Sequence, residues 1–198
     1  MYAAVLDACA LVPVSLADTL LRIAEHGLYR PLWSEQLLDE AQNAILRVHP
    51  GIDPAAVARR FAAMRGYFPD AMVTGWRPLE DGFQLPDPDD RHVLATAIRG
   101  SAQAIVTFNL KDFPAQTLDP FDIEAIHPDD FLGHQLELAP ELVLQALREQ
   151  AAATATPPLS IAALLQILER AGSPTFAAAC REQLTTDDPS NDPDPAED

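Results

Sequence analysis

Four acidic residues stand at places in the sequence where a carboxylate could take part in chemistry. Two follow apolar runs and two lie in helical patterns; they are Asp7, Glu40, Asp90 and Asp112. An ionised carboxylate away from water is costly unless a cation neutralises it. The chain contains a single lysine and twelve arginines, so a bound divalent metal is the simpler partner. Mg²⁺ or Mn²⁺ held by carboxylate and water oxygens can activate water for phosphodiester hydrolysis.

Each acid also has a purely structural interpretation. Asp7 could be a turn acid, Glu40 a helix residue paired with an arginine, and Asp90 a helix cap. Asp87 and Asp89 are further candidate ligands, although capping and a tight turn account for them equally well. Other catalytic classes lack support, because the chain has no GxSxG, Walker A, GxGxxG or HExxH motif.

The elements expected around these acids alternate between strands and helices. Apolar runs predict buried strands over residues 2–6, 28–33, 102–107 and 123–126. Apolar periodicity predicts helices over residues 13–25, 34–48 and 52–68, and a helix that follows Asp90 and ends at Gly100. Residues 70–86 have no regular pattern. This alternation predicts an α/β fold with right-handed βαβ units around a mostly parallel sheet.

That fold would bring the acids together. Asp7 and Asp112 come after strands, and function in open α/β sheets usually lies at the carboxyl ends of the strands. Glu40 lies three residues after Leu37 and four before Ala44. It therefore shares the apolar face of its helix, which includes Val48, and is expected to point toward the interior.

The C-terminal third has a different pattern, which predicts a small, entirely helical extension over residues 133–184. Amphipathic helices are expected over residues 140–153, 160–171 and 174–184. Residues 185–198 are rich in Pro and Asp and contain no basic residue, which is typical of a disordered tail. The expected division is therefore 1–132 for the α/β domain, 133–184 for the extension and 185–198 for the tail.

The net charge of −17 argues against nucleic acid as a partner, because a polyanion attracts basic surfaces. Part of the excess lies in the tail, and bound metal would offset more. One segment is also basic: residues 41–69 carry a local excess of three positive charges, from Arg47, Arg59, Arg60 and Arg65 against Asp53. We expect these arginines to bind RNA phosphates, unless they only cover a solvated helix face.

Four segments resemble, in order, the signature blocks of PIN domains. They are Val5-Leu6-Asp7, the Leu-Leu-Asp-Glu that ends at Glu40, the Asp-Pro-Asp-Asp-Arg-His-Val-Leu-Ala-Thr-Ala of residues 87–97, and the Ile-Val-Thr-Phe-Asn-Leu-Lys-Asp-Phe of residues 105–113. The Pro-Asp-Asp-Phe of residues 128–131 resembles the end of such domains. The resemblance covers about residues 1–132 and implies an α/β/α sandwich.

The resemblance also implies roles for individual residues. It assigns the metal ligands, and thus the catalytic centre, to Asp7, Glu40 and Asp90. Many PIN domains have an aspartate where Asn109 stands, whereas VapC-type members commonly have Thr-x-Asn-x-x-Asp-Phe, as here. Asp112 is therefore the expected fourth acid, and Asn109 a neutral oxygen ligand or a group that positions the substrate.

The function implied by the resemblance is that of a VapC-type toxin, a Mg²⁺- or Mn²⁺-dependent endoribonuclease with a cognate antitoxin and a possible homodimer. The helical extension resembles that of a VapC subgroup. Alternatives are a PIN nuclease for RNA processing or structured DNA, and a catalytically silent module that binds RNA or protein. A haloacid-dehalogenase-like phosphatase would need a second Asp where Cys9 stands.

The remaining features indicate a cytoplasmic protein without a membrane role. No apolar run approaches the length of a bilayer span, and the first residues do not resemble a secretory signal. Cys9 and Cys180 have no metal-ligand spacing and are expected to be buried thiols. Trp33 is expected in the core, whereas Trp76 and Phe108 could either pack or stack on bases.

Overall fold

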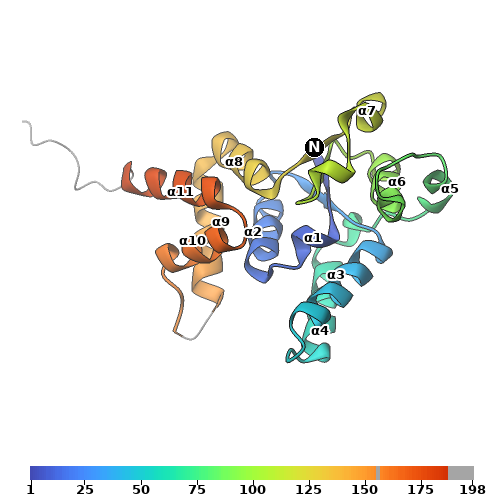
Figure 1. Cartoon of the computed structure of the whole chain (residues 1–198). Coiled ribbons are helices and arrows are strands. Elements are labelled where there is room, and N and C mark those ends of the chain that lie inside the picture. Colours follow the sequence, from blue (N-terminus) through green and yellow to red (C-terminus); the bar gives the residue numbers. More distant parts are fainter. Residues whose placement is uncertain (155–156, 187–198) are drawn as a thin grey trace, which may run out of the picture.

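A four-stranded sheet forms the centre of the computed structural model, which describes residues 1–154 and 157–186 (Figure 1). Its strands are β1 (Ala3–Leu6), β2 (Arg30–Leu32), β3 (Ala104–Val106) and β4 (Glu124–Ile126). They lie in the order β2-β1-β3-β4, and every neighbouring pair is parallel. The α/β class and the parallel sheet expected from the sequence are confirmed. The residues that follow β1 and β3 consequently meet at one edge of the sheet.

Helices surround this sheet. The three longer helices expected before residue 70 are present as α2 (Val14–Glu25), α3 (Glu35–Val48) and α4 (Pro54–Tyr67), and α6 (Arg91–Gly100) packs beside β1 and β3. Three one-turn helices were not expected: α1 (Ala8–Leu11), α5 (Arg77–Glu80) and α7 (Ala115–Leu118). A single turn is too short to display a helical period in the sequence. Short 3₁₀ turns lie at Pro69–Ala71 (η1), Pro88–Asp90 (η2), Leu110–Asp112 (η3) and Asp119–Phe121 (η4).

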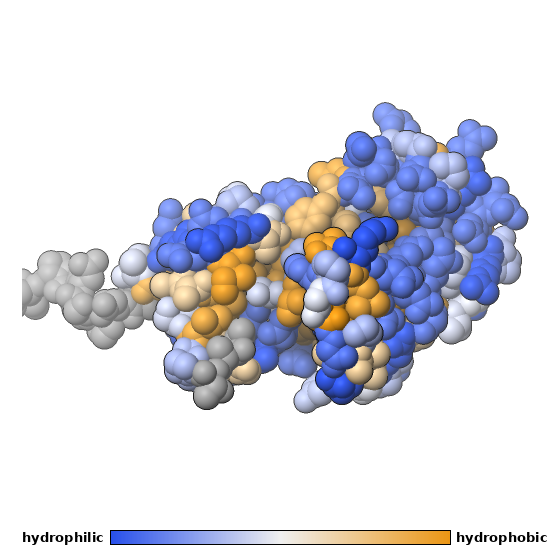
Figure 2. Space-filling model, turned by 60° about the horizontal axis from the view of Figure 1, so that its bottom comes forward, coloured by the Kyte–Doolittle hydropathy of each residue, from blue (hydrophilic) through white to orange (hydrophobic). Residues whose placement is uncertain are grey.

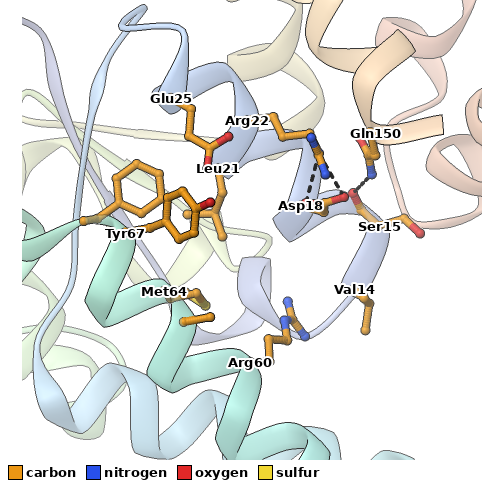
Figure 3. Close-up of a pocket in the computed structure, with 12 residues that line it drawn as sticks. Val14, Ser15, Asp18, Leu21, Arg22, Glu25, Arg60, Met64, Tyr67 and Gln150 are labelled. Atoms are coloured by element: carbon orange, nitrogen blue, oxygen red, sulfur yellow. Dashed lines mark hydrogen bonds and ion pairs between the residues drawn. The ribbon is translucent and has the colours of Figure 1, made fainter. Parts of the chain in front are cut away.

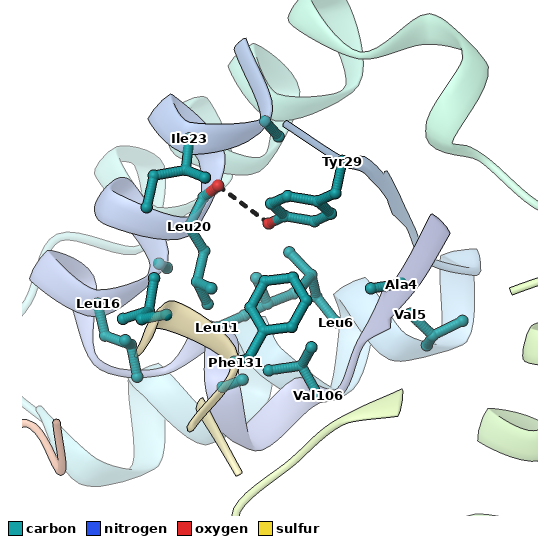
Figure 4. Packing of buried hydrophobic residues seen from close by; sticks show 14 of the residues in the cluster. Ala4, Val5, Leu6, Leu11, Leu16, Leu20, Ile23, Tyr29, Val106 and Phe131 are labelled. Carbon is teal, nitrogen blue, oxygen red and sulfur yellow. Dashed lines mark hydrogen bonds between the residues drawn. The ribbon is translucent and has the colours of Figure 1, made fainter. Parts of the chain in front are cut away.

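The C-terminal helices contribute to the same core as the sheet. Figure 4 shows Leu6 and Val106 of the sheet beside Leu20, Tyr29 and Phe131. The Tyr29 hydroxyl donates to the Leu20 carbonyl oxygen at 2.9 Å, and its ring meets the Phe131 ring edge-on at 4.9 Å. Phe131 belongs to α8 (Pro128–Leu138), so this helix is packed directly onto the α/β layer.

The three helices expected in the extension are present as α9 (Pro140–Thr154), α10 (Ile161–Arg170) and α11 (Pro174–Thr186). They gather with α8 at one end of the molecule (Figure 1). Gln150 joins α9 to α2, because its side chain donates to the Ser15 carbonyl oxygen and accepts from the Thr19 hydroxyl. The expected boundary after residue 132 falls inside α8, and the division into domains stays a proposal. Most of the expected tail, residues 187–198, lies outside the described residues.

Among the residues described, no helix combines the length and the apolar character needed to cross a membrane.

Candidate active site

Asp7 is held at the carboxyl edge of the sheet by two side chains. It follows β1 and is only 5% exposed. Its Oδ2 accepts hydrogen bonds from the Thr107 hydroxyl at 2.6 Å and from the Cys9 thiol at 3.0 Å. Asp7 precedes α1 but makes no side-chain capping bond to it. A capping role in the turn therefore does not explain the position of the Asp7 side chain. The two donated hydrogen bonds fix its carboxylate instead.

The loop after β3 is tied to the same group. The Asn109 amide donates to the Thr107 hydroxyl oxygen at 3.0 Å, and the Phe108 amide donates to Cys9 Sγ at 3.3 Å. Burial, together with the charge of Asp7, raises the pKa of the Cys9 thiol to about 12. Cys9 thus stays a neutral hydrogen-bond donor to Asp7. The loop continues into η3, where Asp112 is half-buried and Asn109 is exposed.

Asp90 lies among several other carboxylates. Its burial, followed by the charges of Asp7, Asp87 and Asp112, raises the pKa of Asp90 to about 7, and His92 opposes this rise. These acids therefore lie close enough to repel one another. Asp90 makes no capping hydrogen bond to α6. Asp87 does act as a cap, because it accepts from the Asp89 amide at 2.9 Å.

Glu40 meets this cluster through a histidine. Its Oε1 lies 3.1 Å from His92 Nε2 and accepts from Gln36 Nε2 at 3.0 Å. Burial alone would raise the pKa of Glu40, but these two hydrogen bonds and the charge of His92 lower it. The Glu40 side chain is 42% exposed, so it is half-buried rather than fully turned toward the interior. Its partner is the buried His92 rather than an arginine.

The carboxylate oxygens of the cluster suit a hard divalent cation, but the side chains are not arranged as a complete set of metal ligands. Among the described residues, no group of three or more His, Cys, Asp or Glu side chains is arranged to hold a metal ion. In the same part of the chain, Asp7, Asp87, Asp90 and Asp112 form no ion pair with Lys or Arg. A cation would relieve the repulsion that raises the pKa of Asp90. Carboxylate oxygens are also the ligands that Mg²⁺ and Mn²⁺ prefer.

The four arginines expected to bind RNA have different environments. Arg65 pairs with Glu35 at 2.6 Å, and Arg60 is partly buried and donates to the Leu11 carbonyl oxygen at 2.9 Å. Arg59 is 70% exposed, with Asp53 at 3.5 Å. Arg47 is exposed and pairs with no acid in the described part of the chain. Arg47 and Arg59 are thus the two exposed arginines of the four, and Arg59 shares its guanidinium group with Asp53.

Arg60 lines a cavity of about 500 Å³ between α2 and α4 (Figure 3). Leu21 and Tyr67 contribute apolar surface to it, and Asp18 and Arg22 form an ion pair at 3.2 Å on its α2 side. Seen from below, apolar residues gather over the middle of the molecule and over the C-terminal helices, whereas the end formed by α5 and α6 is largely hydrophilic (Figure 2). None of the acids of the cluster lines this cavity.

Sequence reasoning did not identify Thr107, Cys9 or His92 as parts of the site. The sequence could have pointed to Thr107, because it is the first residue of the Thr-x-Asn-x-x-Asp-Phe motif and stands two residues before Asn109. The role of His92 emerges only in three dimensions, because α6 carries it to Glu40 of α3. Trp33 and Trp76 are both buried, and the Trp76 ring lies 5.9 Å from that of His92.

Comparisons with known proteins identify the family of this chain. Residues 3–111, more than half of the chain, match the family model described as "PIN domain". The chain belongs to the PIN domain family. In this PIN protein, residues 128–182 match a second model, described as "VapC50 C-terminal domain", and this region comprises α8 to α11 almost entirely.

A curated relative of this PIN protein is the Mycobacterium tuberculosis (strain ATCC 25618 / H37Rv) protein named "Putative ribonuclease VapC50". The two are 43% identical over 100 residues, which cover 50% of this chain and 59% of the relative. The match thus spans less than two thirds of the length of that relative. No solved structure gives a significant match to the chain.

Proposed function

We propose that this PIN protein is a metal-dependent endoribonuclease and the toxin of a toxin–antitoxin pair. The observation that carries the proposal is the group of mutually repelling carboxylates around Asp90, at the edge of the sheet where β1 and β3 end. Asp7, Glu40, Asp90 and Asp112 would hold Mg²⁺ or Mn²⁺, with Asn109 as a neutral oxygen ligand. The bound ion would supply an activated water and offset charge on the transferred phosphate.

The side chains around the cluster prepare it for this task. Thr107 and Cys9 hold Asp7 in one orientation by donating to the same carboxylate oxygen. The buried His92 holds Glu40 in its ionised form at the rim of the cluster. A carboxylate that is fixed before the ligand arrives loses little freedom on binding, which favours preorganised catalysis.

Arg47 and Arg59 would contact the RNA backbone. Arg47 stands seven residues after Glu40 on α3, and this spacing of about two turns puts both residues on one helix face. A strand whose scissile phosphate lies at the acids could therefore extend along α3 toward Arg47. These contacts would supply the attraction that the net charge of −17 lacks.

The toxin role rests on the resemblance to VapC-type proteins. It is supported by a curated relative named "Putative ribonuclease VapC50" and by the match of residues 128–182 to the family model described as "VapC50 C-terminal domain". An antitoxin that covers the acidic cluster is the implied protein partner, the cytoplasm the implied compartment, and a homodimer is compatible with the family. A small antitoxin gene beside the gene for this chain would support the toxin role.

Brief induction in bacterial cells tests the proposal. We expect the wild-type chain to stop growth and to create new RNA 5′ ends at a defined sequence or structure, whereas Asp7→Asn does neither. Asp39→Asn, which changes an exposed acid of α3, serves as the matched control and should behave as wild type. Cleavage without growth arrest would indicate a role in RNA processing instead. RNA binding without any cleavage would indicate a catalytically silent module. Either result would contradict the proposed toxin function.

A further inference from the structure

The turn between α10 and α11 lies directly against the loop that carries Asn109 and Asp112. Gly172 forms this turn with a positive φ of +96°. A Cβ atom at Gly172 would lie 2.7 Å from Cε1 and 3.2 Å from Cζ of the Phe108 ring. Only glycine therefore lets the turn approach the ring this closely, and it also accepts the backbone conformation.

Phe108 connects this turn to the acidic cluster. Its ring meets the His127 ring edge-on at 5.0 Å, so the Phe108 side chain contacts both the residue after β4 and the α10–α11 turn. Its backbone amide donates to Cys9 Sγ, and Cys9 donates to Asp7. A shift of the ring would thus be transmitted to the backbone beside Asn109 and Asp7.

A buried carboxylate fixes the turn itself. Asp129, in the first turn of α8, is 7% exposed. Its two oxygens accept from the Thr175 and Phe176 amides, at 3.0 and 2.8 Å, at the start of α11. The Asp129 amide in turn donates to His127 Nδ1 at 3.2 Å. The carboxylate thereby satisfies two of the unpaired amides that begin α11 and ties this helix to α8.

We propose that the C-terminal helices position the active-site loop, which is the segment after β3 that carries Asn109 and Asp112. Gly172 and Phe108 are the positioning residues, and Asp129 anchors the turn. The extension is then part of the framework of the cluster rather than an independent appendage. The catalytic consequence rests on the proposed nuclease function, but the positioning itself does not. A misplacement of about 1 Å in a catalytic group can cost on the order of a hundredfold in rate, so this contact matters for turnover.

Substitution of Gly172 by Ala tests the proposal against a control with the same backbone strain. Gly27 has a φ of +77°, and a Cβ there would meet nothing within 4 Å. Gly27→Ala therefore introduces strain without a clash, whereas Gly172→Ala introduces both. We expect both variants to lose thermal stability, and Gly172→Ala to lose more because of the added clash. Only Gly172→Ala should shift the backbone amide resonances of Asn109 and Asp112 in ¹⁵N-labelled protein.

The same variants separate positioning from stability in the cleavage assay. Gly172→Ala should lower kcat for RNA cleavage about tenfold or more and leave KM unchanged, because the RNA-binding arginines are not affected. In a Phe108→Leu background, which removes the Cε1 and Cζ contacts, the same Gly172→Ala change should have a smaller effect on the resonances and on kcat.

The resonances decide the proposal whether or not the chain cuts RNA. Resonances of Asn109 and Asp112 that stay unchanged in Gly172→Ala would overturn it, as would a shift of equal size in the Phe108→Leu background. A wild-type chain that shows no cleavage would instead remove the proposed nuclease function and leave the positioning test standing.

Discussion

Asp90 is the residue at which burial and charge conflict most directly. Its pKa is raised from 3.8 to about 7, first by burial and then by Asp7, Asp87 and Asp112. The folded state therefore holds this proton more tightly than the unfolded state does. The resulting stabilisation is fully present below about pH 4 and is lost as the pH rises through about 7. An ionised Asp90 is tolerated at neutral pH only at the expense of stability, unless a cation is bound.

Asp90→Asn should consequently stabilise the metal-free protein at high pH. We expect a higher unfolding temperature than wild type at pH 8 in EDTA, and nearly equal temperatures at about pH 3, where Asp90 is largely protonated in both states. Differential scanning calorimetry at the two pH values measures this, with Asp39→Asn as control. A lower unfolding temperature for Asp90→Asn at pH 8 would contradict the repulsion on which the metal site rests.

Thr107 should act through its hydroxyl, which donates to Asp7 and accepts from the Asn109 amide. Thr107→Val keeps the shape but removes both hydrogen bonds, so the Asn109 amide loses this acceptor while Asp7 keeps the bond from Cys9. We therefore expect a loss of about 1–3 kcal/mol in the free energy of unfolding together with slower RNA cleavage. Thr107→Ser retains the hydroxyl and should recover most of both properties. Greater damage from Ser than from Val would show that packing of the methyl group, not the hydrogen bonds, explains the role of Thr107.

Helices α3 and α4 illustrate what apolar patterns predict and what they miss. The patterns located both helices, and Ser34 and Asp53 cap them as their sequences indicate, by accepting from the Leu37 and Ala55 amides. Periodicity did not predict that Glu40 is only half-buried, because it reports a helix face and not the histidine that the side chain contacts at the edge of that face. Val48, in the last turn of α3, is exposed although it belongs to the same apolar stripe.

The acids were easier to predict than the residues that hold them. Each acid stands at the end of a strand or helix that the sequence reveals, so Asp7, Asp90 and Asp112 could be expected at one edge of the sheet. His92 and Cys9 acquire their roles from contacts between elements far apart in sequence, as when Cys9 meets Phe108. The same is true of Arg60, whose bond to the Leu11 carbonyl no local pattern reveals.

The exposed arginines of α3 and α4 should set the salt dependence of RNA binding. Neutralising both in Arg47→Gln/Arg59→Gln should lower RNA affinity and reduce the slope of log affinity against log salt by about 1.4, the value for two phosphate contacts to a single strand. Fluorescence anisotropy over a salt series measures the slope. Arg65→Gln, whose arginine is already paired with Glu35, is the control; an equal effect from this variant would indicate only a change in net charge.

At the scale of the whole molecule, the sheet and the C-terminal helices share one core. The Tyr29–Phe131 contact joins the sheet side to α8, Asp129 joins α8 to α11, and Gln150 joins α9 to α2. Elements that are linked in this way are expected to unfold in one cooperative transition. The positioning of the active-site loop by the α10–α11 turn depends on this continuity.

Asp129→Asn should therefore destabilise the whole protein rather than release α11 alone. Loss of the charged acceptor should lower the free energy of unfolding by about 1.5–3 kcal/mol. Tryptophan fluorescence, which reports on the buried Trp33 and Trp76, and far-UV circular dichroism, which reports on all helices, should give coincident transitions. The exposed neighbour in Asp130→Asn should change little, and separate transitions for the two probes would contradict a shared core.

The carboxylate cluster is tested most directly by the rate at which purified protein cleaves an end-labelled RNA, measured for wild type and Asp7→Asn in Mn²⁺ and in EDTA. We expect cleavage by wild type in Mn²⁺, none in EDTA, and a rate for Asp7→Asn that is lower by on the order of a hundredfold or more. Undiminished cleavage by Asp7→Asn, or cleavage by wild type in EDTA, would contradict a metal-dependent nuclease centred on these acids.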